Sequence, residues 1–168
     1  MELESLRAVF SALLKSEARF LVAGGLAVIA HGYVRATEDL DLILDLSSPN
    51  AERALAALQT LGYSPLNPVA IESFANPEKR LEWITTKNAK VFQLYSDVHP
   101  SVRIDLFLDE PLDFEQALQR ASWQKISEGN SVPFVALRDL LELKRKAGRP
   151  KDLIDLDRLG RIHRPPDR

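Results

Sequence analysis

The segment from Asp39 to Leu46 constrains the fold more than any other part of the chain, because every second residue in it is leucine. Successive side chains on a strand point to opposite faces of a sheet, so these leucines share one face. Asp39, Asp41, Ile43 and Asp45 share the other face. The segment is therefore predicted to be a strand that buries its leucine face in a core and presents carboxylates on the other.

Helical and strand patterns alternate along the rest of the chain. Helices are predicted at 3–14, 26–31, 48–61, 113–120, 137–147 and from 150 onward, and strands at 20–23, 40–46, 90–95 and 101–108. Residues 78–86 fit either a helix or a strand, and 123–126 with 132–135 fit a further strand or a hairpin. Ser48 is expected to cap the helix that starts at Pro49.

Composition indicates the class of protein. The 168 residues suit one domain with a sizeable core, and 45% of them are hydrophobic. Lys and Arg number 22 against 24 Asp and Glu, so the net charge of −2 gives no overall attraction to nucleic acid. Cysteine is absent, which excludes disulfides and thiolate metal sites. Neither a signal peptide nor a run of about 18 apolar residues is evident, so a cytoplasmic protein without a membrane partner is expected.

Three aspartates on two predicted strands form the chemically informative arrangement. Asp39 and Asp41 are two residues apart, so they point the same way and can share one divalent cation or bridge two. Mg²⁺ favours one or two carboxylates together with phosphate oxygens and water, and Mn²⁺ is the alternative. Asp105 on a second strand can complete the site as a ligand, or accept the proton of an attacking hydroxyl. These residues predict a metal site that binds a nucleoside triphosphate.

Nucleotide-binding residues are predicted at two further places. Gly24 and Gly25 have no side chains to block a triphosphate, and the helix that they open offers free N–H groups to an anion. Lys144 in the tail can neutralise phosphate charge, although a solvated helix face is an equally good interpretation. For Arg35, a salt bridge is favoured over a phosphate contact. The cations around Arg149 are read as ion pairs, or else as a basic patch for RNA.

At its glycine pair, its Asp-x-Asp and its third aspartate the chain resembles the nucleotidyltransferase superfamily, whose fold is shared with DNA polymerase beta. Residues 21–44 match the family pattern closely. The chain is most similar to a bacterial branch related to the nucleotidyltransferase toxins of type IV toxin–antitoxin pairs. In that branch a tail like residues 143–152 is usual, so the resemblance covers nearly the whole chain.

This resemblance implies an enzyme that transfers a nucleoside monophosphate from a triphosphate to an acceptor hydroxyl, with pyrophosphate leaving. It gives Asp39 and Asp41 the role of Mg²⁺ ligands, and gives Asp105 a metal or base role. The acceptor implied is RNA such as tRNA, a protein or a small antibiotic, and a toxin of this kind implies an antitoxin partner.

The elements and the resemblance together predict an α/β (α+β) nucleotidyltransferase fold, with a short mixed sheet backed by helices and a C-terminal helical tail. Residues 1–168 are expected to form a single domain, with an α/β core over 1–135 and tail helices over 136–163.

Two less specific interpretations stay open. The chain can be a binding protein of this fold that has lost catalysis, such as an antitoxin-like module, although the presence of all three aspartates argues against decay. The acidic strand can also be an ordinary edge strand with a solvated face. Trp83 and Trp123 are expected to be core or packing residues rather than platforms for base stacking.

Overall fold

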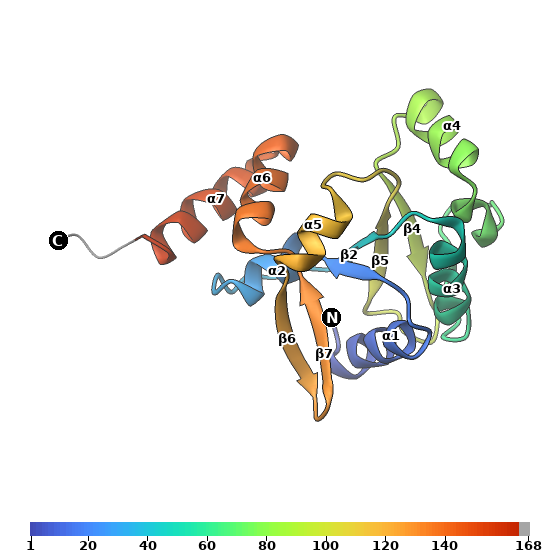
Figure 1. The fold of residues 1–168 in the computed structure, drawn as a ribbon, viewed down its shortest axis with the longest axis horizontal. Coiled ribbons are helices and arrows are strands. Elements are labelled where there is room, and N and C mark those ends of the chain that lie inside the picture. The colour runs from blue at the N-terminus through green and yellow to red at the C-terminus, as the bar shows by residue number, and fades with distance from the viewer. Residues whose placement is uncertain (165–168) are drawn as a thin grey trace.

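The computed structural model describes residues 1–164, which form a mixed sheet with helices packed against it (Figure 1). The strands are β1 (Phe20–Val22), β2 (Asp39–Leu44), β3 (Ser64–Pro65), β4 (Val91–Tyr95), β5 (Arg103–Phe107), β6 (Ser122–Ser127) and β7 (Asn130–Phe134). Their order in the seven-stranded sheet is β3-β4-β5-β2-β1-β7-β6. The β2–β5 and β1–β7 pairs are parallel, and the other pairs are antiparallel. The predicted mixed sheet is therefore confirmed.

The helices follow the predicted order. They are α1 (Leu3–Lys15), α2 (Gly24–Ala30), α3 (Ser48–Gln59), α4 (Pro77–Lys87), α5 (Phe114–Gln119), α6 (Leu137–Ala147) and α7 (Pro150–Ile162), with a short 3₁₀ helix at Ile71–Ala75. The segment that fitted either a helix or a strand is thus the helix α4, and Asn76 caps it by accepting hydrogen bonds from two backbone N–H groups. Within residues 1–164, no helix has both the length and the apolar character that a membrane crossing requires.

The hydrophobic core lies under the leucine face of β2. Leu40, Leu42 and Leu44 are at most 1% exposed, and they join one buried cluster with Leu13 of α1 and Leu55 of α3. The core also extends to one leucine on each tail helix. The predicted assignment of the leucines to the buried face is confirmed, and it leaves the aspartates of β2 on the opposite face, away from α1 and α3.

Two local predictions are wrong. Ser48 is not the N-cap of α3, because the helix begins at Ser48 itself and the Ser48 hydroxyl donates to the Ala75 carbonyl at 3.1 Å. Trp83 is buried in the core, as predicted, and stacks on Phe92, whereas Trp123 is not a core residue because it is 57% exposed. Trp123 lies on β6, the edge strand of the sheet, in the β6–β7 hairpin that extends from the body of the protein (Figure 1).

Candidate active site

The three predicted site aspartates lie together on adjacent parallel strands. Asp41 of β2 is the register partner of Asp105 of β5, and Asp39 is the partner of Arg103. Paired strands are about 4.8 Å apart and partners point to the same face, so one polar surface carries all four side chains. The alternation within each strand predicted the face, whereas the pairing of β2 with β5 brings Asp105 beside Asp41.

The glycine pair closes the site on the β1 side. Gly24 begins α2 with φ +59°, a left-handed conformation that favours glycine. A Cβ atom on Gly24 would overlap the Asp41 carboxylate, and one on Gly25 would overlap the Thr37 side chain. The backbone N–H of Gly25 lies close enough to the Asp41 carboxylate to lower its pKa, in opposition to burial, which raises it. The two glycines are therefore required by how closely Asp41 approaches the start of the helix.

The site is electrostatically unfavourable for carboxylates without a cation. Burial raises the pKa of Asp41 to about 6, and the neighbouring Asp105 adds to this shift, while Lys144 and the Gly25 N–H oppose it. Burial also raises the pKa of Asp105, partly offset by the hydrogen bond from Gln93. Crowded, partly buried carboxylates favour protons or metal ions over free charge.

Each carboxylate has its own partner in the structure. Asp39 pairs with Arg103 at 3.2 Å, and the same guanidinium contacts Glu38 at 3.2 Å. Gln93 on β4 donates its side-chain amide to Asp105 Oδ1 at 3.1 Å. Among residues 1–164, no three His, Cys, Asp or Glu side chains stand close enough together to hold a metal ion. Metal binding would therefore require side chains to rotate, with Asp39 leaving Arg103.

The donor chemistry nevertheless fits Mg²⁺ or Mn²⁺. Carboxylate oxygens are the hard ligands that these ions prefer, and the ions normally complete their coordination with phosphate oxygens and water. Asp41 and Asp105 are adjacent across the β2–β5 pair and neither forms a salt bridge within the described residues. Asp41, and Asp39 after its release from Arg103, would therefore hold the ion, with Asp105 beside Asp41 as a further ligand or as a base.

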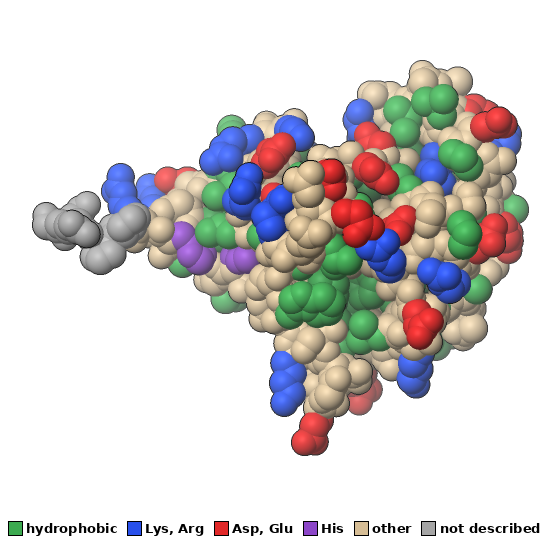
Figure 2. Space-filling view, viewed as in Figure 1, with side chains coloured by type: hydrophobic (Ala, Val, Ile, Leu, Met, Phe, Trp, Pro, Cys, Tyr) green, Lys and Arg blue, Asp and Glu red, His purple; other side chains and the backbone are tan. Residues whose placement is uncertain are grey.

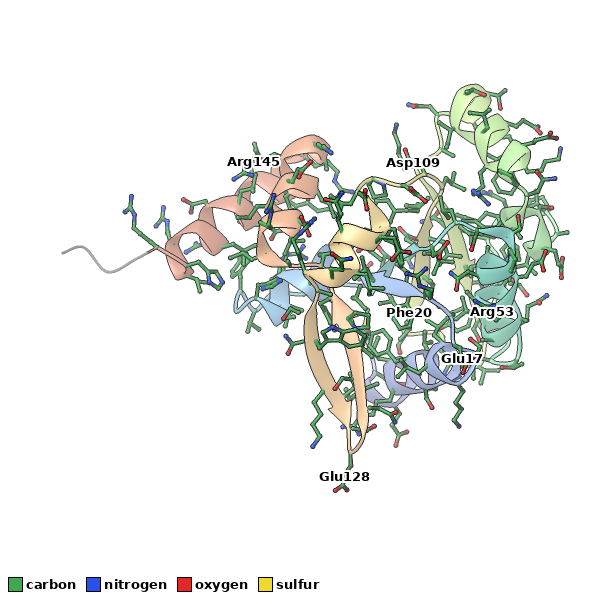
Figure 3. All side chains as sticks on the ribbon, in the orientation of Figure 1. Glu17, Phe20, Arg53, Asp109, Glu128 and Arg145 are labelled. Atoms are coloured by element: carbon green, nitrogen blue, oxygen red, sulfur yellow. The ribbon has the colours of Figure 1, made fainter. Side chains whose placement is uncertain are left out.

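Lys144 is buried, so the interpretation of a solvated helix face is wrong. Its ammonium group contacts Asp152 at 2.9 Å and Asp155 at 2.8 Å, and its side chain is 5% exposed. The neighbouring Arg145 points outward from α6 (Figure 3). Lys144 thus joins α6 to α7, and its charge also lowers the pKa of Asp41. Its predicted contact with the triphosphate stays a prediction, because two carboxylates already hold the ammonium group.

Arg35 forms a salt bridge, as favoured from the sequence. The bridge is largely buried, however, whereas a surface salt bridge was expected. Its guanidinium donates to both oxygens of Asp155, at 2.8 and 2.9 Å, and that carboxylate is 1% exposed. The pair connects the loop before β2 to α7. Because Asp155 also binds Lys144, one buried carboxylate connects both tail helices to the loop that leads into β2.

The start of α7 supplies cations that sequence reasoning did not assign to the site. Arg149 pairs with Asp152, and interaction with Asp41 contributes to raising its pKa. Lys151 is exposed, and its charge lowers the pKa of Asp105. The sequence feature that could have identified them is the basic run next to the start of α7. Only the packing of α7 in the fold brings this run near the aspartates.

The surface charge is mixed. Figure 2 shows basic and acidic side chains interspersed on the face in view, and the described residues on that face form no continuous basic stripe. The face in view therefore lacks the concentrated basic patch that is typical of a large nucleic-acid surface.

A protein-family comparison matches nearly the whole chain. The family model described as "Nucleotidyl transferase AbiEii toxin, Type IV TA system" matches residues 7–168. No curated protein sequence was found to match the chain.

Several solved structures share the fold. The lincosamide antibiotic adenylyltransferase LnuA, bound to lincomycin, superposes with a TM-score of 0.61 at 13% identity, covering 95% of this chain and 96% of that chain. The protein ANT(2")-Ia in complex with adenylyl-2"-tobramycin has a TM-score of 0.57 at 14% identity, with 94% and 86% coverage. JHP933 from Helicobacter pylori has a TM-score of 0.52 at 13% identity, with 95% and 65% coverage. At such identities these likenesses confirm the predicted fold.

Proposed function

Because this chain belongs to the AbiEii family of nucleotidyl transferase toxins, we propose that it is a divalent-metal-dependent enzyme that moves a nucleoside monophosphate from a triphosphate to an acceptor hydroxyl. The observation that carries this proposal is the register pairing of Asp41 with Asp105 directly beside the start of α2 at Gly24. Carboxylates of the kind that bind Mg²⁺ next to free N–H groups of the kind that bind phosphate support this proposal.

The residues have distinct roles in the proposed reaction. Asp39 and Asp41 hold Mg²⁺ or Mn²⁺, and the Gly24-Gly25 backbone faces the triphosphate. Asp105 serves as a further ligand or as the base that accepts the proton of the acceptor hydroxyl. A bound divalent ion supplies positive charge that stabilises the phosphates as pyrophosphate leaves.

Cations of the tail complete the proposed phosphate site. Lys151 is exposed near Asp105, so it is free to contact the triphosphate. Arg149 is held by Asp152 yet its side chain is 58% exposed, which leaves donors available to an anion. Lys144 contributes its positive charge and holds α7 in place. Its ammonium group would contact the phosphates only after breaking its ion pair with Asp152 or Asp155.

The acceptor and the partner are proposed from the family. A type IV toxin is expected to have an antitoxin partner, and we propose that one controls this chain. RNA such as tRNA is the proposed acceptor, with a protein as an alternative. The structure of LnuA contains lincomycin and that of ANT(2")-Ia contains adenylyl-2"-tobramycin. Lincomycin and tobramycin are therefore included in the screen.

A labelled-transfer screen tests the proposal. Pure protein is incubated with each α-labelled nucleoside triphosphate, Mg²⁺ or Mn²⁺, and total tRNA, cell extract, tobramycin or lincomycin. Metal-dependent label on one acceptor is the expected result, and EDTA should abolish it. The Asp41→Asn variant is the negative control, since it removes a metal ligand. Absence of transfer to every acceptor, together with absence of metal-coupled triphosphate binding, would contradict the proposal.

A further inference from the structure

The order of the strands gives the site two sides, one toward β1 and one toward β5 and β4. The inference drawn below from these two sides rests on the proposed function. The triphosphate is assigned to the start of α2, which follows β1, whereas β5 and β4 lie on the other side of β2. In phosphoryl transfer the attacking and leaving oxygens are roughly in line on opposite sides of phosphorus. If pyrophosphate leaves toward Gly24, the acceptor hydroxyl must attack from the β5 side.

We propose that the acceptor reaches the site over β4, and that Gln93 is the residue that positions Asp105 to meet it. Gln93, Asp105 and Asp41 are successive register partners on β4, β5 and β2. They therefore form one row across the sheet, with Gln93 farthest from the glycine pair. Strand β4 also lies on the opposite side of β2 and β5 from α6 and α7 (Figure 1), so the tail helices do not cover it.

The contact between Gln93 and Asp105 fixes one carboxylate oxygen. The Gln93 amide donates to Asp105 Oδ1 at 3.1 Å, and within residues 1–164 no other side chain donates to Asp105. An amide is neutral, so it orients the carboxylate without the strong charge compensation that an arginine would provide. Oδ2 is left free to accept a proton from the acceptor.

Tyr95 extends the same surface along β4. It lies two residues beyond Gln93 and hence on the same face, with 39% of its area exposed. The neighbouring strand β3 pairs its backbone with this end of β4, with Ser64 opposite Tyr95, and the side chain of Tyr95 nevertheless stays partly exposed. The side chain of Arg103 is 51% exposed next to this row. An exposed aromatic ring, an amide and a guanidinium beside Asp105 form a surface that can hold an acceptor in place.

A single introduced thiol tests the direction of approach, because the chain has no cysteine. Tyr95→Cys is alkylated with a bulky maleimide, and Ser127→Cys on the far hairpin is the matched control. Transfer to the acceptor found in the screen should fall by about a hundredfold for the Tyr95→Cys adduct, as expected when an acceptor is displaced from the reacting geometry. Triphosphate affinity, titrated separately with Mn²⁺, should change by less than about threefold, because the adduct lies on the acceptor side. The Ser127→Cys adduct should behave like the unmodified protein in both assays.

Gln93→Met tests the positioning role. It keeps the length of the side chain but removes the donor, so kcat should fall about two- to tenfold, the usual effect of one lost neutral hydrogen bond. The KM for the triphosphate should stay unchanged, which separates positioning from loss of structure. Gln124→Met on β6 makes the same chemical change away from the site and should alter neither constant.

The outcomes distinguish this inference from the proposed function. If the Tyr95→Cys adduct transfers at the unmodified rate, or if Gln93→Met raises the triphosphate KM and spares kcat, the acceptor side or the positioning role is wrong while the enzyme assignment stands. If the unmodified protein transfers nothing to any acceptor and binds no triphosphate with metal, the proposed function fails and this inference fails with it.

Discussion

The carboxylate of Asp41 occupies the space that a side chain on Gly24 would need. Gly24→Ala should therefore displace Asp41 as well as strain a left-handed residue, which costs about 1–2 kcal/mol by itself. We expect a larger loss in the free energy of unfolding than that figure, together with weaker metal-coupled triphosphate binding. Gly129→Ala is the matched control, since Gly129 has φ +78° but no atom near its Cβ position. Equal losses in urea unfolding for both variants would show that the overlap with Asp41 is not significant.

Removing the Asp41 charge should stabilise the protein when no metal is present. Because burial and Asp105 raise the pKa of Asp41 to about 6, its ionised form is disfavoured in the folded state. The free energy of unfolding of Asp41→Asn is expected to exceed that of wild type by up to about 3 kcal/mol at pH 7 in EDTA. Asp45→Asn on the same segment should instead lower the free energy of unfolding, by about 1 kcal/mol. Although burial opposes it, hydrogen bonds from Ser47 and Arg19 lower the pKa of Asp45. A loss above roughly 2 kcal/mol for Asp41→Asn would instead identify a structural carboxylate.

Lys144 should contribute more to stability than any nearby exposed cation. Lys144→Met leaves Asp152 and Asp155 buried without this partner, so the free energy of unfolding should fall by about 3–5 kcal/mol. Arg145→Met changes the adjacent, exposed residue and should stay within about 0.5 kcal/mol of wild type. Chemical unfolding of both variants measures the difference, and similar values for the two would contradict the buried ion cluster.

Acid should weaken the junction between α6 and α7. Burial alone would raise the pKa of Asp152, but hydrogen bonds from Arg149 and Lys144 outweigh it and lower the pKa to about 2, from a usual value of 3.8. A depressed folded pKa gives stability that is present above pH 4 and is lost as the pH falls toward 2. The contribution is about 2 kcal/mol.

Unfolding of wild type and Asp152→Asn between pH 7 and pH 2.5 checks this sign. The two curves should converge as the pH falls through this window. Asp157→Asn alters an exposed residue on the same helix, and its curve should run parallel to that of wild type. A gap between wild type and Asp152→Asn that stays constant down to pH 2.5 would show that the carboxylate does not titrate as described.

Asp105 separates catalysis from binding. A base that acts on the acceptor contributes mainly in the transition state, so Asp105→Asn should still bind triphosphate within a few-fold of wild type. Transfer should fall by about 10²–10⁴, the usual contribution of a positioned general base. Asp41→Asn should impair both binding and transfer, because it removes a metal ligand. Wild-type transfer by Asp105→Asn would exclude the base role.

Much of the candidate site could be predicted from local pattern. The alternation of leucine and aspartate from Asp39 to Leu44 depends only on the two-residue period of a strand, so the polar face follows without knowledge of the neighbours. The alternation around Asp105 identifies its face in the same way. The position of Gly24 at the start of a helix could be predicted because a glycine turn between a strand and a helix is a local feature of the sequence.

The environment of each charged residue could not be predicted in this way. The sequence by itself determined most of the helices and strands, the buried face of β2, and the shared face of Asp39 and Asp41, because these depend on periodicity within one segment. Only the tertiary structure decided that Lys144 is buried between carboxylates of α7, that Gln93 lies against Asp105, and that Trp123 is exposed. Burial and pairing depend on which distant segments pack together, and strand order and helix packing are properties of the whole fold.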